Sequence, residues 1–103
     1  MTALLFRVEG VVQGVGFRAW TCETARACGL VGFVRNVRDG AVEGAAYGAE
    51  QRLRRFVDAL HTGPPSARVT LVKVRPTTAR CADPSQFRFA QTAPAPTPDW
   101  PEM

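Results

Sequence analysis

The sequence predicts an α+β domain in which one mixed β-sheet is covered on one face by two helices. Three observations support this fold class. Strand-like and helix-like segments follow one another in the order β-α-β-β-α-β, a pattern typical of the ferredoxin-like split βαβ sandwich. The chain has 103 residues, enough for one small domain. Its 46% hydrophobic and 21% charged residues are ordinary for a globular protein.

The first half of the chain contains a strand, a helix and two further strands. Residues 3–12 are rich in Leu, Phe and Val and predict the first strand. Residues 17–28 predict a helix, because Gly29 supplies the left-handed residue that commonly ends one. Residues 30–37 and 41–47 predict the second and third strands.

The dipeptide Asp39-Gly40 between these strands predicts a tight hairpin. Such a pair is typical of a two-residue type I′ turn, which needs positive φ at both positions. A helix joins the first and second strands, so these strands run parallel through a right-handed crossover. The third strand runs opposite and fits between them. The ends of the first two strands therefore lie at one edge of the sheet, about 10 Å apart at ~4.8 Å per strand spacing.

The second half of the chain adds a helix and two strands. Residues 49–61 predict a helix with one apolar stripe at i, i+3, i+4 and i+7, formed by Leu53, Phe56, Val57 and Leu60. Residues 68–75 predict the fourth strand and residues 86–90 a short closing strand. We expect the domain to span residues 1–91, because prolines then crowd the chain. Residues 92–103 should form a Pro-rich tail without fixed structure.

Cysteine content and the absence of targeting segments favour a soluble cytoplasmic protein. The formal net charge is +4, and Lys73 is the only lysine. The three cysteines, Cys22, Cys28 and Cys81, form no Cys-x-x-Cys pair, which argues against a local metal site and for thiols in a reducing compartment. No signal peptide pattern and no apolar run of transmembrane length is present.

The glycine-rich stretch after the first strand predicts an anion-binding loop. Gly14 and Gly16 allow the backbone to turn tightly, so that N–H groups of the loop and of the first helical turn point at one spot. Arg18 follows in the first turn, where helical side chains lean back toward the N-terminus. Its planar guanidinium fits two phosphate oxygens. The candidate phosphate-binding residues are Gln13, Gly14, Val15, Gly16, Phe17 and Arg18.

Asn36, at the end of the second strand, is the second candidate catalytic residue. The predicted topology brings this side-chain amide to the sheet edge that also holds the glycine loop. Taken singly, each candidate also fits a plain structural role: a tight turn, an exposed helix residue and a polar strand end. The expectation that the glycine loop, Arg18 and Asn36 all lie at the same edge of the sheet favours a functional site.

Two other functions agree less well with the sequence. Gly14-Val-Gly16-Phe-Arg-Ala19 matches a loose dinucleotide-binding fingerprint, but Asp39 is better used in the hairpin turn and the chain is short for a doubly wound sheet. RNA-recognition domains share this strand order but need exposed aromatic residues on the first and third strands. Only Phe6 and Tyr47 are candidates for that role.

Two long motifs resemble the signatures of the acylphosphatase family. They are Val8-x-Gly10-x-Val12-Gln13-Gly14-Val15-x-Phe17-Arg18 and Gly32-x-Val34-Arg35-Asn36-x-x-Asp39-Gly40-x-Val42-Glu43. Gly63-Pro64-Pro65-Ser66-Ala67-Arg68-Val69 and Phe87-Arg88-Phe89 are similar to further family landmarks. The resemblance extends to about residue 90. The departures are Phe33, where a tryptophan is common, and Ala19, where an aromatic is frequent.

The resemblance implies hydrolysis of the carboxyl–phosphate bond of small acyl phosphates. Arg18 and backbone N–H groups of residues 13–18 would hold the phosphoryl oxygens, and Asn36 would orient the attacking water. It also implies no metal and no cofactor, since arginine and N–H dipoles supply the positive potential. We expect a monomer whose partners are acyl phosphate and inorganic phosphate, with no nucleic acid and no membrane.

A non-catalytic module that binds phosphate or carbamoyl phosphate is the alternative. It would use the same loop without turnover. The presence of both Arg18 and Asn36 favours the enzyme.

Overall fold

The computed structural model describes residues 2–81 and 83–95 and contains two helices and a five-stranded sheet. The elements in chain order are β1 (Thr2–Val11), α1 (Phe17–Ala27), β2 (Val31–Asn36), β3 (Val42–Gly48), α2 (Glu50–Thr62), β4 (Arg68–Pro76) and β5 (Phe87–Phe89). These bounds agree within one residue with the segments predicted from the sequence. Neither described helix is long and apolar enough to cross a membrane.

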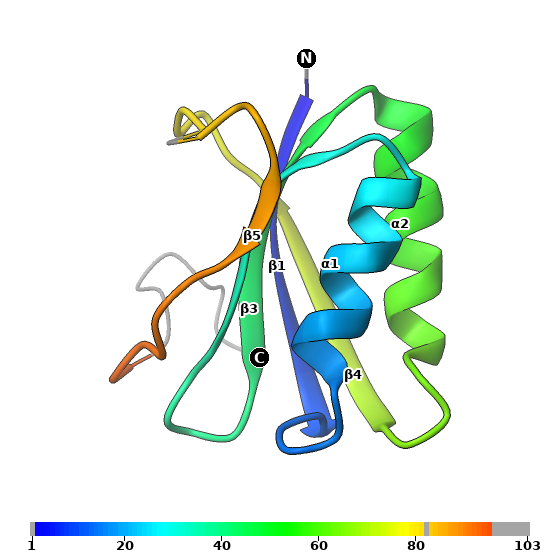
Figure 1. The fold of residues 1–103 in the computed structure, drawn as a ribbon, viewed down its shortest axis with the longest axis vertical. Coiled ribbons are helices and arrows are strands. Elements are labelled where there is room, and N and C mark those ends of the chain that lie inside the picture. The colour runs from blue at the N-terminus through cyan, green and yellow to red at the C-terminus, as the bar shows by residue number, and fades with distance from the viewer. Residues whose placement is uncertain (1, 82, 96–103) are drawn as a thin grey trace.

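The sheet has the order β4-β1-β3-β2-β5, and both helices pack on the same face (Figure 1). The pairing of β5 with β2 is parallel, and the other neighbouring strands are antiparallel. This confirms the α+β ferredoxin-like class and the position of β3 between β1 and β2. Val42 of β3 pairs with Val8 on one side and Asn36 on the other, so the ends of β1 and β2 do meet at one edge.

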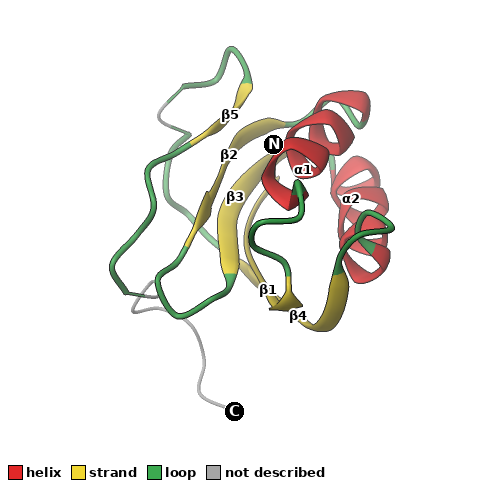
Figure 2. Cartoon of the chain, turned by 60° about the horizontal axis from the view of Figure 1, so that its bottom comes forward, coloured by secondary structure: helices red, strands yellow, loops and turns green. Residues whose placement is uncertain are grey.

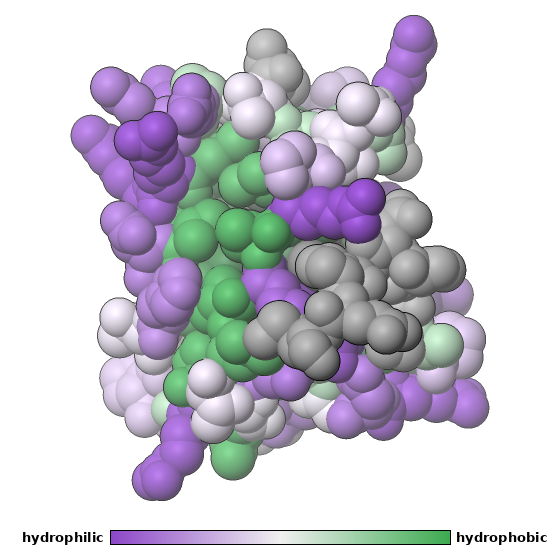
Figure 3. Space-filling model, turned by 180° about the vertical axis from the view of Figure 1, so that it is seen from behind, coloured by the Kyte–Doolittle hydropathy of each residue, from purple (hydrophilic) through white to green (hydrophobic). Residues whose placement is uncertain are grey.

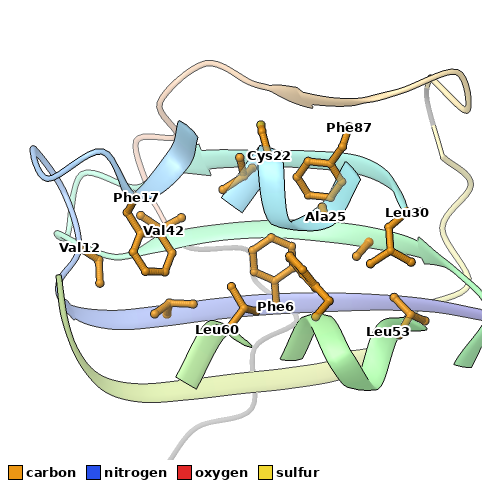
Figure 4. Close-up of a cluster of buried hydrophobic side chains, with 14 residues drawn as sticks. Phe6, Val12, Phe17, Cys22, Ala25, Leu30, Val42, Leu53, Leu60 and Phe87 are labelled. Atoms are coloured by element: carbon orange, nitrogen blue, oxygen red, sulfur yellow. The ribbon is translucent and has the colours of Figure 1, made fainter. Parts of the chain in front are cut away.

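The core lies between the sheet and the helices (Figure 4). Alternation along β1 directs Phe6 and Val8 into it, and the Phe6 ring meets the Phe56 ring of α2 edge-on, with centroids 5.2 Å apart. The helix positions that the apolar stripe predicted are buried at Leu53, Phe56 and Leu60. The full cluster is Phe6, Val8, Val12, Phe17, Cys22, Ala25, Leu30, Val34, Val42, Ala46, Leu53, Phe56, Leu60 and Phe87.

Not all hydrophobic side chains lie inside the core. Seen from behind, a band of hydrophobic side chains runs down the surface, with hydrophilic side chains along its left side (Figure 3). Among the described residues, the large hydrophobic side chains that remain exposed are Val11, Val74 and Phe89. Phe89 is the one that lies beside the candidate active site.

The hairpin between β2 and β3 forms as predicted, but the two-residue type I′ turn is wrong. The N–H of Val37 donates to the Ala41 carbonyl, and the N–H of Gly40 donates to the Val37 carbonyl. The loop thus has three residues, and only Gly40 has positive φ, at 102°. This geometry matches a type I turn followed by a bulge glycine. Asp39 keeps a negative φ because its carboxylate accepts the Ala41 N–H within the turn.

The chain stays attached to the sheet beyond the predicted boundary at residue 91. Ala93 forms an isolated parallel bridge with Val37 and is 7% exposed. Residues 96–103, the rest of the predicted tail, lie outside the described residues.

The cysteines that the structure describes are unpaired, as predicted from their number and spacing. Cys22 is buried, and Cys28 and Cys81 are half-buried. Burial raises the pKa of the Cys22 thiol, although Arg26 and Arg18 oppose this. A raised pKa keeps the thiol protonated, as expected for a packing residue rather than a nucleophile.

Candidate active site

The loop between β1 and α1 folds as the glycines predict (Figure 2). Gly14 has φ 73° and Gly16 has φ 77°, conformations that side chains with a Cβ rarely adopt. A Cβ added to either residue would meet nothing within 4 Å. The backbone conformation, and not crowding, therefore requires glycine at both positions, and the space beside them is open.

The first turn of α1 has the features of an anion-binding site. The N–H of Trp20 donates to the carbonyl of Gly16, the helix cap. The N–H groups of Phe17, Arg18 and Ala19 precede it and have no helical acceptor. The cap provides no side-chain hydrogen bond, and the first turn holds no acidic residue. These N–H groups and the positive end of the helix dipole favour a negatively charged ligand.

A hollow of about 160 Å³ lies at this helix start. Its walls come from the loop, from α1, from the end of β2 and from β5. The lining residues are Val12, Gly14, Gly16, Phe17, Arg18, Ala19, Asn36 and Phe89. The structure therefore brings Arg18 and Asn36 to one hollow. Gln13 and Val15, also predicted for the loop, are not among the lining residues.

Arg18 is half-buried beside the hollow and faces an aromatic ring. The guanidinium carbon lies 5.6 Å from the centre of the Phe89 ring, within cation–π range. No carboxylate in residues 2–81 and 83–95 forms an ion pair with Arg18. The guanidinium can therefore give its hydrogen bonds to a ligand.

Asn36 presents an acceptor without a donor. Its Oδ1 atom is buried and has no hydrogen-bond partner. Leaving such an acceptor buried and unpaired costs about 1–3 kcal/mol. Asn36 is also one of the residues that line the hollow, so a water bonded to its side-chain amide would stand next to an anion held by the loop.

Gln13 anchors the loop rather than lining the hollow. Its side-chain Nε2 donates to the carbonyl oxygens of Val37 at 2.6 Å and Ala41 at 2.8 Å. On the other side of the loop, the Ser66 hydroxyl donates to the Val15 carbonyl at 2.7 Å. The sequence motif predicted only the backbone of Gln13 as functional; the side-chain bonds cross to the β2–β3 hairpin.

An ion pair supports the same hairpin from β1. The Arg7 guanidinium donates to Asp39 and, through Nε, to Glu9 at 3.0 Å. Burial alone would raise the pKa of the Asp39 carboxyl, but hydrogen bonds from Arg7 and from the Ala41 N–H outweigh it and hold that pKa below its ordinary value. Asp39 is therefore ionised at neutral pH and is committed to the hairpin.

Sequence reasoning did not assign Phe89 or Ser66 to the site. Ser66 bonds the loop at Val15 and Phe89 faces Arg18 of α1, and both come from segments far along the chain. The register of β5 on β2 and the path of the chain between α2 and β4 position them. Both residues belong to segments that resemble family landmarks, but neither segment by itself indicates which residue it contacts. Among the described residues, no group of three or more His, Cys, Asp or Glu could hold a metal ion.

Comparison with known proteins identifies the family of this chain. The family model described as Acylphosphatase matches residues 4–89. An acylphosphatase of Rhodospirillum rubrum is 46% identical over 88% of this chain and 96% of its own length. One from Thermotoga petrophila is 51% identical over 76% of this chain and 87% of its own. The crystal structure of acylphosphatase from Bacillus subtilis superposes with a TM-score of 0.81 at 36% identity, covering 87% of this chain and 99% of that one.

Proposed function

The chain belongs to the acylphosphatase family, and from that premise we propose that it hydrolyses the carboxyl–phosphate bond of small acyl phosphates. One observation supports this most directly. Arg18 and Asn36 line the same hollow at the start of α1, and the side-chain Oδ1 of Asn36 has no hydrogen-bond partner within the described part of the protein. One group suits the phosphoryl oxygens and the other suits the water that attacks phosphorus.

The phosphoryl group would bind against the N–H groups of the loop and of the first turn of α1. Arg18 would donate to two of its oxygens, which Gly14 and Gly16 allow to approach the backbone closely. These donors are in place before the substrate binds. They stabilise the charge that spreads over the equatorial oxygens in the transition state, usually the largest catalytic contribution.

Asn36 would then position the nucleophile. A water that donates to Oδ1 of Asn36 keeps a lone pair for attack on phosphorus. The bond from phosphorus to the acyl oxygen breaks as the new P–O bond forms, and the electron pair leaves with the carboxylate. An amide is a poor base, so the water's proton ends on the phosphate. A carboxylate is a good leaving group and needs no general acid, which fits a site that contains no histidine.

We propose that this chemistry runs without a metal ion, in a monomeric cytoplasmic enzyme. The Arg18 guanidinium and the helix start supply the positive potential that a cation provides elsewhere. The three thiols have no disulfide partner within the described residues, which fits a reducing compartment.

Incubation with acetyl phosphate tests the proposal, with release of inorganic phosphate as the readout and a phosphate monoester as the comparison substrate. We expect turnover of acetyl phosphate and very slow turnover of the monoester, whose alkoxide is a poor leaving group. Phosphate binding without turnover would instead support the alternative, a module that binds phosphate or carbamoyl phosphate.

RNA binding has less support from the geometry. Phe6 is 1% exposed and packs on Phe56 beneath the sheet, and Tyr47 is 7% exposed. Neither ring is available for base stacking. Salt-sensitive retention of the protein on immobilised RNA would contradict this conclusion.

A further inference from the structure

The segment of residues 90–93 lies along the outer edge of β2, next to Asn36. β5 pairs Phe87, Arg88 and Phe89 with residues 32–34 of β2. The chain, orange in Figure 1, then continues past β5 toward the β2–β3 hairpin. The N–H of Ala90 donates to the carbonyl of Val34 at 2.9 Å. The sheet pairing thus extends beyond residue 89, where the match to the family model ends.

Ala93 bonds the backbone of Asn36 itself. Its N–H donates to the Asn36 carbonyl at 2.9 Å, and its carbonyl accepts the Arg38 N–H at 3.0 Å. The methyl side chain is buried, and Ala93 bridges Val37 in parallel. Four residues of β2 and its extension, Val34 to Val37, lie opposite five residues of the outer segment, Phe89 to Ala93, so the outer segment bulges by one residue.

These bonds complete the restraint on one peptide unit. The carbonyl of Asn36 is bonded to Ala93, and the N–H of Val37, in the same peptide plane, donates to the Ala41 carbonyl at 2.9 Å. The peptide is therefore held from both sides. Without Ala93, the Asn36 carbonyl would lose this bond while the Val37 N–H kept its bond to Ala41. The plane could then tilt on its carbonyl side, together with the Asn36 side chain.

We propose that Ala93 is a positioning residue, which acts through its backbone to aim the Asn36 amide at the attacking water. The proposal rests on the proposed function, because the aim of Asn36 matters only if it holds a nucleophile. Effective attack requires reacting atoms about 3–3.5 Å apart and aligned, so a small pivot of the amide lowers the rate. Phosphate binding depends on the opposite wall of the hollow and should change little.

Two full-length variants at one position test this. Ala93→Pro removes the N–H that bonds Asn36, and Ala93→Gly keeps it and removes only the methyl group. We expect Ala93→Pro to lower kcat by about three- to tenfold relative to Ala93→Gly. The inhibition constant of inorganic phosphate should differ by less than about twofold between the two variants, and their Tm values should be similar. Equal kcat values in the two variants would overturn the proposal. A parallel loss of kcat, phosphate affinity and Tm would also overturn it, because it would show a structural role only.

Hydrogen exchange of the unmodified protein provides a second, independent measurement. The amides of Ala93 and Arg38 should be protected in the folded protein, and fast exchange at both would overturn the proposal even if Ala93→Pro failed to fold. Failure of the proposed function can be distinguished from failure of the Ala93 proposal. If the proposed function is wrong, the unmodified protein will not hydrolyse acetyl phosphate, whether or not the amides of Ala93 and Arg38 are protected.

Discussion

The side-chain amide of Gln13 donates a 2.6 Å hydrogen bond to the carbonyl of Val37, the residue that directly follows Asn36. A second bond reaches Ala41 on the far side of the turn. One side chain therefore connects the loop that would hold phosphate to the hairpin that holds Asn36. In the proposed mechanism, the separation between the bound phosphate and the attacking water would depend on this connection.

Replacing Gln13 should affect the alignment of the two halves of the site. Gln13→Leu removes both hydrogen bonds, and we expect kcat to fall by about tenfold; the exposed Gln51→Leu serves as the matched control. Gln13→Glu places a carboxylate against two carbonyl oxygens at neutral pH, and protonation at lower pH restores one donor. The kcat of Gln13→Glu should therefore recover, relative to the unmodified enzyme, as pH falls toward 5. A pH-independent deficit would contradict this account.

Arg18→Ala should abolish catalysis and weaken phosphate binding while the fold survives. The loss of a charged hydrogen-bonding partner costs about 1.5–3 kcal/mol in binding, and kcat should fall by about 10²–10³-fold. Arg18→Lys should restore little, because a point charge cannot bond two oxygens in a plane. The exposed Arg55→Ala is the control for net charge. Near-normal kcat/KM in Arg18→Ala would refute the role assigned to Arg18.

Asn36→Ala should separate catalysis from binding. Because Asn36 would hold the water and not the phosphate, kcat should fall by about 10²-fold or more while competitive inhibition by inorganic phosphate stays nearly unchanged. Steady-state kinetics with a phosphate titration measures both quantities. The opposite pattern, weak phosphate inhibition with normal kcat, would make Asn36 a phosphate-binding residue.

Activity should persist in excess EDTA. Near the site, the Glu43 carboxylate is 2.6 Å from the Arg35 guanidinium and is 1% exposed, and Asp39 is bonded to Arg7. Both are poorly placed to recruit a cation. Raised ionic strength and added phosphate should inhibit the enzyme. Activity that vanishes with EDTA and returns with Mg²⁺ would overturn the metal-free mechanism.

The Arg7–Asp39 pair should make stability depend on acid pH. The folded pKa of Asp39 lies below its ordinary value, so its contribution is complete above about pH 4, the unfolded pKa, and is lost as pH falls through the folded pKa. Asp39→Asn should lower Tm at pH 7 by about 2–6 °C, the equivalent of about 0.5–1 kcal/mol. The deficit should shrink below pH 4. Thermal melts from pH 7 to pH 2 measure it, with the exposed Asp58→Asn as control.

The sequence by itself determined the order of the elements, the glycine loop, and two of the residues that line the hollow, Arg18 and Asn36. These features rest on local rules. Apolar alternation and the helical stripe identify strands and helices, glycine at Gly14 and Gly16 marks positive φ, and the parallel crossover brings the ends of β1 and β2 to one edge. Arg18 and Asn36 could be chosen because each lies at the end of a strand or the start of a helix.

Only the tertiary structure decided how those residues are held. The carboxylate of Asp39 accepts the Ala41 N–H within the turn and, through its other oxygen, a hydrogen bond from Arg7 on another strand. The Gln13 side chain, the Phe89 ring and the Ala93 backbone reach the site from positions whose partners lie 24 or more residues away. Such contacts depend on strand register and on the path of the chain after β5. Neither is encoded in the periodicity of any one segment, because register is set by cross-strand packing of the whole sheet.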